Sequence, residues 1–300
     1  MDREVFTDPA VAGFANGSLL VYKVDVEKEE GKALARRFGI RYLPTFIFVD
    51  GEGKELDRQV GPSGKGDFLS YMKEVASGNH LAALRAKVEK SPEDGALRAD
   101  LGLRLAKNED PGAREHLEKA VALDPKNARG TTVRVRYHLA VLDLEEKKAP
   151  AGLAAFAKEF PENPLTVDAH RILVGVCEQS GDAEGEEASL EFLVKRAPEP
   201  WTRNGLAWFL ATRGRDLERA LGLADAALKD QPQEAAYLDT RAECLSRLGR
   251  HDEAGAAQEK AVRCLAEDIE PEVREQYEGR LAEFQKKRDD ARAKGGEAPR

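Results

Sequence analysis

The sequence contains little cysteine and no long apolar run. Its three cysteines among 300 residues, Cys177, Cys244 and Cys264, are too few and too scattered for a disulfide framework. We therefore expect reduced, unpaired thiols. The longest apolar runs, such as 45–49 and 206–210, fall far short of the roughly 20 residues that a membrane-spanning helix needs. The sequence thus predicts neither a disulfide-stabilised small domain nor a membrane protein.

The sequence also lacks an excess of basic residues. It has 47 Lys and Arg against 55 Asp and Glu, a formal net charge of -8. A nucleic-acid backbone or an anionic membrane surface would need a basic face on the protein, so we expect neither partner. The first six residues are not basic and no apolar segment follows them, which predicts no signal peptide and, for the chain as written, a cytoplasmic protein.

Most strand signals lie in the first quarter of the chain. With 41% hydrophobic and 34% charged residues, the composition is that of globular domains. Apolar spacing, β-branched residues and turn residues predict alternating elements over residues 1–78: a strand at 19–26, a helix at 32–38, strands at 45–49 and 55–60, and a helix at 65–74. Gly51 and Gly53 predict a tight turn between the last two strands.

Residues 80–290 are rich in alanine and leucine and helical in period. Prolines recur 33 to 39 residues apart, at positions 92, 125, 161, 198, 232 and 271. A period of this length built from helix pairs is typical of an α-solenoid. Alanines two helical turns apart mark second helices that must pass close to a neighbour: Ala113 and Ala120, Ala220 and Ala227, and Ala254 and Ala261. We expect about five helix pairs, packed through these alanines.

This pattern resembles the tetratricopeptide (TPR) repeat. Leu123-Asp124-Pro125 matches the usual end of a repeat, and residues 235–265 match best, whereas the middle repeats are degenerate, with Phe156 in place of an alanine. We expect the helix that Pro271 opens to cap the stack, and residues 291–300 to form a disordered tail. The resemblance implies that protein or peptide partners bind the concave face lined by the first helices.

The segment from Gly39 to Thr45, followed by a strand and a hairpin, resembles the region around the cis-proline of the thioredoxin fold. The resemblance covers about 75 residues and depends most on Pro44, where proline allows a cis peptide bond. It implies that Leu43, Pro44 and Thr45 guide the backbone of a substrate protein. The predicted fold class is an α/β thioredoxin-like partial domain followed by an all-α TPR solenoid.

Thiol–disulfide exchange in that family needs a Cys-x-x-Cys pair at a helix N-terminus, where the helix dipole stabilises the thiolate. No cysteine precedes Cys177, and the strand that would lead into the motif, between those predicted at 19–26 and 45–49, is missing as well. We expect a chain truncated at its front end. The alternative is a degenerate domain that serves as a docking surface. The strand edges left without partners also predict dimerisation.

Two functions follow from these resemblances. The family implies thiol–disulfide exchange. If an upstream segment is missing, it also implies an export signal and a periplasmic or other extracytoplasmic location. The chain as written has no catalytic residue, and we expect it to act through protein binding. The alternative is a non-catalytic TPR scaffold, so enzyme activity is open. We expect no cofactor and no metal, because the histidines at 80, 116, 138, 170 and 251 lack a second ligand at a suitable spacing.

Overall fold

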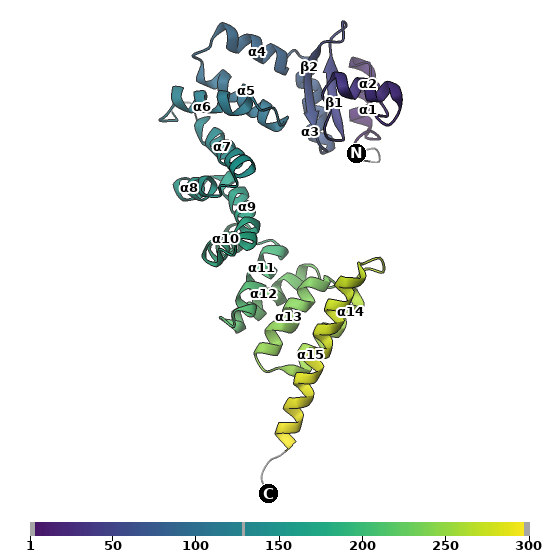
Figure 1. The fold of residues 1–300 in the computed structure, drawn as a ribbon, viewed down its shortest axis with the longest axis vertical. Helices are drawn as coiled ribbons and strands as arrows, with labels where there is room; N and C mark the ends of the chain where they lie inside the picture. The colour runs from purple at the N-terminus through teal and green to yellow at the C-terminus, as the bar shows by residue number, and fades with distance from the viewer. Residues whose placement is uncertain (1–3, 128–129, 297–300) are drawn as a thin grey trace. The chain divides into compact units, whose positions relative to one another are not determined.

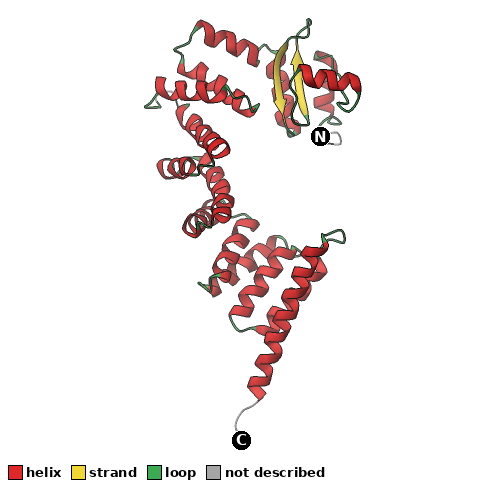
Figure 2. Ribbon diagram, viewed as in Figure 1, coloured by secondary structure: helices red, strands yellow, loops and turns green. Residues whose placement is uncertain are grey.

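The computed structural model describes residues 4–127 and 130–296, with side chains through residue 293. These residues form 15 helices and one two-stranded sheet (Figures 1 and 2). The chain divides into two compact units, Met1–Gly152 and Leu153–Arg300. The predicted fold class is confirmed, since a small sheet with helices comes first and a helical solenoid follows.

The two strands form an antiparallel hairpin at the predicted positions, β1 (Thr45–Val49) and β2 (Glu55–Val60). Asp50 holds the turn between them, because its carboxylate accepts a hydrogen bond from the backbone nitrogen of Lys54 at 2.9 Å. Gly53 has a φ of 75°, a left-handed conformation that glycine adopts without strain. This turn fixes the register in which Thr45 lies opposite Val60.

Three helices accompany the hairpin: α1 (Pro9–Ser18), α2 (Glu29–Arg37) and α3 (Lys65–Ala76). Aromatic rings pack α3 against one face of the sheet. The ring centroids of Phe68 and Phe46 lie 4.7 Å apart, and those of Tyr71 and Phe48 lie 5.4 Å apart. Val11 of α1 is buried in the same cluster. This aromatic layer is the core of the N-terminal part of the chain.

The strand predicted at 19–26 is wrong: this segment contains no strand in the structure. A strand requires a neighbour that satisfies its backbone hydrogen bonds, and β1 and β2 are the only paired strands among the described residues. Leu20 and Tyr22 are 96% and 87% exposed, and Val21 is also exposed. The apolar composition that suggested a buried strand therefore lies on the surface.

Asp57 of β2 joins the hairpin to the helices that follow, α4 (Leu81–Lys90) and α5 (Gly95–Lys107). Its fully buried carboxylate accepts a hydrogen bond from the backbone nitrogen of Leu81 at 2.8 Å and pairs with the guanidinium of Arg104 at 2.6 Å. Tyr71 lies beside this pair, and burial, followed by the charge of Asp57, raises the pKa of Tyr71. The first compact unit therefore continues beyond residue 78.

The helices after α4 follow one another as five pairs: α5 with α6 (Ala113–Leu123), α7 (Thr132–Lys147) with α8 (Ala151–Glu159), α9 (Pro164–Ser180) with α10 (Ala183–Arg196), α11 (Pro200–Thr212) with α12 (Leu217–Asp230), and α13 (Ala235–Arg247) with α14 (His251–Cys264). Prolines open α9 and α11, where the missing N–H costs no hydrogen bond. No helix within residues 4–127 and 130–296 is both long and apolar enough to cross a membrane.

The division between the two compact units falls in α8, inside the repeat that the sequence marks as degenerate. Phe156 occupies the alanine position there and is 4% exposed, so a large ring fills the space that a small residue occupies in the regular repeats. The domain limits predicted from sequence, 1–78 and 80–290, mark where the sequence pattern changes. The compact units divide the chain at a different place, between Gly152 and Leu153.

The last helix, α15 (Pro271–Gly296), packs against α14. Phe284 is its buried anchor, at 1% exposure, and Val273, Tyr277 and Leu281 are partly buried on the face predicted to cap the stack. The helix continues six residues into the predicted tail, because Ala291 to Lys294 are strong helix formers. Residues 297–300 of that tail lie outside the described residues.

Candidate functional site

The loop before β1 presents the residues predicted to guide a substrate backbone. The Leu43–Pro44 peptide bond is cis. The carbonyl of Pro44 accepts a hydrogen bond from the backbone nitrogen of Gly61 at 2.9 Å, and the hydroxyl of Thr45 donates to the carbonyl of Tyr42 at 2.6 Å. Leu43 and Tyr42 are 65% and 57% exposed. The loop is thus held at its base while its apolar side chains face solvent.

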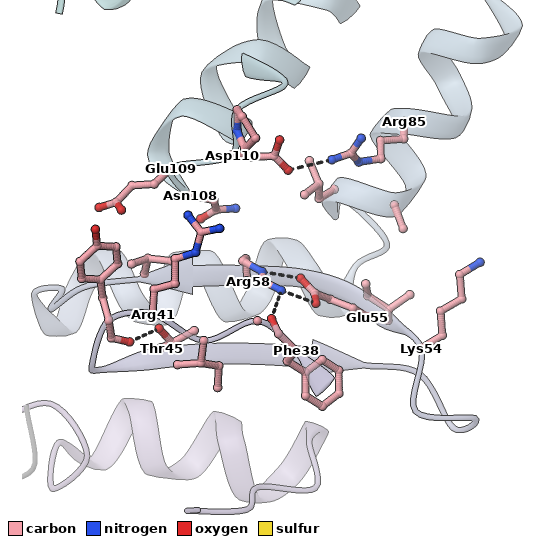
Figure 3. Close-up of a pocket in the computed structure, with 18 of the residues that line it drawn as sticks. Phe38, Arg41, Thr45, Lys54, Glu55, Arg58, Arg85, Asn108, Glu109 and Asp110 are labelled. Carbon is pink, nitrogen blue, oxygen red and sulfur yellow. Dashed lines mark hydrogen bonds and ion pairs between the residues drawn. The ribbon is translucent and has the colours of Figure 1, made fainter. Parts of the chain in front are cut away.

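A cavity of about 670 Å³ adjoins this loop within the first compact unit (Figure 3). Its walls are the loop at 38–45, β2, α4 and the turn between α5 and α6. Two ion pairs stand in these walls. Arg58 bonds Glu55 through two nitrogens, at 2.6 and 2.7 Å, and Arg85 pairs with Asp110 at 3.1 Å. The bonds to Glu55 raise the pKa of Arg58 above its ordinary value.

Asn108 is the polar wall residue of this cavity whose amide nitrogen has no hydrogen-bond partner. Asn108 directly follows the last residue of α5, and the residue is 8% exposed. A buried donor without a partner costs roughly 1–3 kcal/mol. The cavity wall therefore contains a buried donor without a protein partner, while Arg41 and Tyr42 of the same wall are exposed.

Two of the three cysteines lie in surroundings that disfavour a thiolate. Cys177 and Cys244 are buried, and burial raises the pKa of both thiols, that of Cys244 to about 12. A thiol with a raised pKa is a poor nucleophile at neutral pH. Among the residues with described side chains, no group of three His, Cys, Asp or Glu residues is placed to hold a metal ion.

The six alanines predicted as packing residues are all buried, at 4% exposure or less: Ala113, Ala120, Ala220, Ala227, Ala254 and Ala261. They lie on α6, α12 and α14, the second helices of their pairs. In the first unit α5 and α6 approach closely at Gly102, where an added methyl group would lie 2.7 Å from Leu117 of α6. These small residues let paired helices approach closely, and they build the scaffold of the solenoid.

A second candidate surface lies in the second compact unit. We define the first-helix face as Trp201 and Trp208 of α11, Asp239 and Glu243 of α13, and Arg280 of α15. The two tryptophans are two helical turns apart and therefore on one side of α11, where they are 39% and 37% exposed. The indole nitrogen of Trp201 donates to Glu199 at 2.5 Å. Exposed tryptophans of this kind are typical of interaction surfaces.

Arg280 connects the three helices of the first-helix face. Its guanidinium lies 5.1 Å from the ring centroid of Trp208 and bonds Asp239 at 2.7 Å and Glu243 at 3.1 Å. Both acidic residues are 8% exposed, so this is a largely desolvated cluster. Sequence reasoning missed this cluster, and it also missed Asn108. No motif joins these residues, because folding brings them together from distant repeats.

Comparison with known proteins agrees with this architecture. Residues 1–76 match the family model of the thioredoxin-like domain. The solved structure of YrrB, described as a TPR protein with an unusual peptide-binding site, is similar over 63% of this chain and 95% of its own, with 19% identity and a TM-score of 0.50. A tetratricopeptide repeat protein from Parabacteroides merdae matches over 75% of this chain and 85% of its own, with 18% identity and a TM-score of 0.39.

MamA AMB-1 matches over 60% of this chain and 95% of its own, at 22% identity and a TM-score of 0.44. No curated protein matches the sequence. The first 76 residues are thus similar to the thioredoxin-like domain, and the remainder has a TPR-like fold.

Proposed function

We propose that this chain binds an extended segment of a protein partner on the concave face of its solenoid, of which the first-helix face is a part. The observation that carries the proposal is the pair of half-exposed tryptophans, Trp201 and Trp208, on one side of a first helix. Tryptophan buries a large area at low entropic cost, and it is enriched among the residues that dominate binding energy. A TPR-like solenoid presents such residues along a continuous surface.

In this proposal the cis-proline loop guides the backbone of a bound protein in the first compact unit. Leu43 presents an exposed side chain and leaves its backbone available for pairing, while Pro44 and Thr45 hold the loop against β2 and Tyr42. A segment that passes this loop has access to the cavity, where Arg41 and Tyr42 are exposed.

Peptide display against the full chain tests the proposal. Selected peptides should bind the unaltered protein, and the double variant Trp201→Ala, Trp208→Ala should lose about 2 kcal/mol of binding free energy, as central tryptophans do. Arg263→Ala is the matched control, because Arg263 is exposed on the second helix α14. Peptides whose affinity is unchanged by the double variant would place binding elsewhere and defeat the proposal.

Thiol–disulfide exchange is the second candidate function, and the thioredoxin-like match at residues 1–76 favours it. This chain has no cysteine before Cys177, so the exchanging pair would come from a longer form of the protein. The intact mass and the N-terminal peptide of the protein from its native source decide the question. A mass above 33.0 kDa with an upstream Cys-x-x-Cys supports exchange, and an export signal there would also give an extracytoplasmic location. A mass of 33.0 kDa supports the scaffold.

The exposed apolar segment at 19–26 favours self-association as well. Leu20, Val21 and Tyr22 present apolar side chains to solvent, and adjacent chains can pair through such extended segments. Sedimentation over a range of concentrations should show a dimer, and Tyr22→Ser with Leu20→Ser should shift it to the monomer. A monomer at every concentration would rule out this dimer.

A further inference from the structure

The second compact unit carries the whole net charge of the chain. Residues 153–300 contain 22 Lys and Arg against 30 Asp and Glu, which equals the net charge of -8 of the full sequence. Residues 1–152 are therefore neutral overall. An acidic unit attracts basic partners over long distances and raises their association rate.

The first-helix face already binds one guanidinium, that of Arg280. This group lies over the ring of Trp208, where the aromatic face attracts the cation, and two carboxylates fix its orientation by hydrogen bonds. The arrangement combines a tryptophan face with acidic acceptors. The same combination of groups would bind an arginine side chain from another protein.

Trp201 offers the same chemistry without an internal cation. It lies two turns before Trp208 on the same side of α11, and no cation of the described residues lies over its ring. Its indole nitrogen is held by Glu199, so the ring has a fixed orientation while 39% of the residue stays exposed. Glu199 also accepts a bond from Arg171 at 2.6 Å through its other oxygen, so the carboxylate that holds the indole is itself fixed in position.

We propose that the first-helix face selects partner segments that contain arginine, with a guanidinium of the partner stacked on Trp201. The inference rests on the proposed function, because it names the chemical class of the segment that the solenoid binds. The positive charge of the segment complements the acidic unit, and the planar guanidinium stacks on an indole better than an ammonium group does. Arginine is therefore preferred to lysine at this position.

The two tryptophans make the test direct, because they are the only tryptophans in the chain and both lie on the first-helix face. We would titrate the full chain with four synthetic peptides of equal length in which glycine alternates with arginine, lysine, serine or glutamate, and follow the tryptophan fluorescence. The arginine peptide should bind at least about tenfold more tightly than the serine and glutamate peptides, and its binding should weaken with added salt.

Variants locate the contact. Trp201→Ala should weaken the arginine peptide about 2- to 30-fold, the range that a cation–π contact supplies, while Trp201→Phe should retain part of the affinity. Arg263→Ala on the opposite helix should leave the affinity unchanged. Equal binding of all four peptides, or an unchanged affinity in Trp201→Ala, would overturn the inference. Display-selected peptides without arginine that still require both tryptophans would overturn it as well, and they would leave protein binding in place.

Discussion

The close approach of α5 and α6 predicts that Gly102→Ala destabilises the first compact unit. A methyl group at this position would lie 2.7 Å from Cδ2, 2.8 Å from Cγ and 3.0 Å from the backbone nitrogen of Leu117. Carbon atoms pack comfortably at roughly 3.5–4.0 Å. Leu117 is fully buried and its backbone nitrogen belongs to α6, so the two helices must separate.

The expected loss follows from two opposing effects. Overpacking of a close-packed core costs about 1–3 kcal/mol. Alanine in place of glycine inside a helix stabilises the folded state by about 0.5–1 kcal/mol. We therefore expect Gly102→Ala to lower the free energy of unfolding by about 1–2 kcal/mol. Gly222→Ala in α12 is the control, because nothing lies within 4 Å of the added methyl group, and it should stabilise the chain slightly.

Hydrogen exchange measured on peptides from α5 and α6 reports this loss locally, which suits a solenoid whose parts open separately. Both tryptophans lie in the second unit, so their fluorescence should show an unfolding transition that Gly102→Ala leaves unchanged. In a Leu117→Ala background the contacts with Cδ2 and Cγ are removed and the approach to the backbone nitrogen at 3.0 Å remains, so the same substitution should cost less. An equal loss in both backgrounds would refute the steric explanation.

Three further predictions concern buried polar groups and thiols. Asp57→Asn should cost about 3–5 kcal/mol in the first unit, because it leaves the Arg104 guanidinium without its buried partner, whereas the exposed Asp67→Asn should not change the melting temperature. In the folded chain Cys264 alone should react quickly with a thiol reagent, since the other two cysteines are buried, and three fast thiols would contradict the structure. Burial lowers the pKa of His170 below 6.5, so protonating this ring costs more in the folded chain than in the unfolded chain. The free energy of unfolding should therefore be unaffected by His170 above pH 6.5 and should fall as the pH drops below it. Denaturation followed by tryptophan fluorescence should show a smaller loss between pH 7.5 and 5.5 in His170→Gln, and equal losses would contradict the assignment.

Local patterns were enough to predict much of the fold. The hairpin was predicted at the observed positions, because local features of its turn, the bonds to Asp50 and the left-handed Gly53, leave a clear sequence signal. The solenoid was predicted from proline spacing and alanine pairs, because each repeat mostly contacts its neighbours. The strand at 19–26 was wrong, because pairing depends on a partner strand that local composition does not reveal.

The candidate surfaces were harder to predict for the same reason. Leu43, Pro44 and Thr45 are contiguous and carry a recognisable motif, so a local pattern was enough to predict them as candidates. Asn108 lines the cavity only because α5 ends beside β2, and three helices separate Arg280 of α15 from Trp208 of α11 in the sequence. Side chains that meet through tertiary packing leave no spacing that a sequence pattern records.

The buried contacts of Asp57 change how the N-terminal part should be understood. A two-stranded hairpin is marginally stable by itself in water, and here α3 and its aromatic rings cover only one face. The fully buried Asp57 supplies an acceptor for the first amide of α4 and a partner for Arg104 of α5. Residue 78 therefore separates two segments that differ in sequence pattern, and the buried ion pair between Asp57 and Arg104 connects these segments. Helices α4 and α5 therefore stabilise the thioredoxin-like hairpin as well as beginning the helical solenoid.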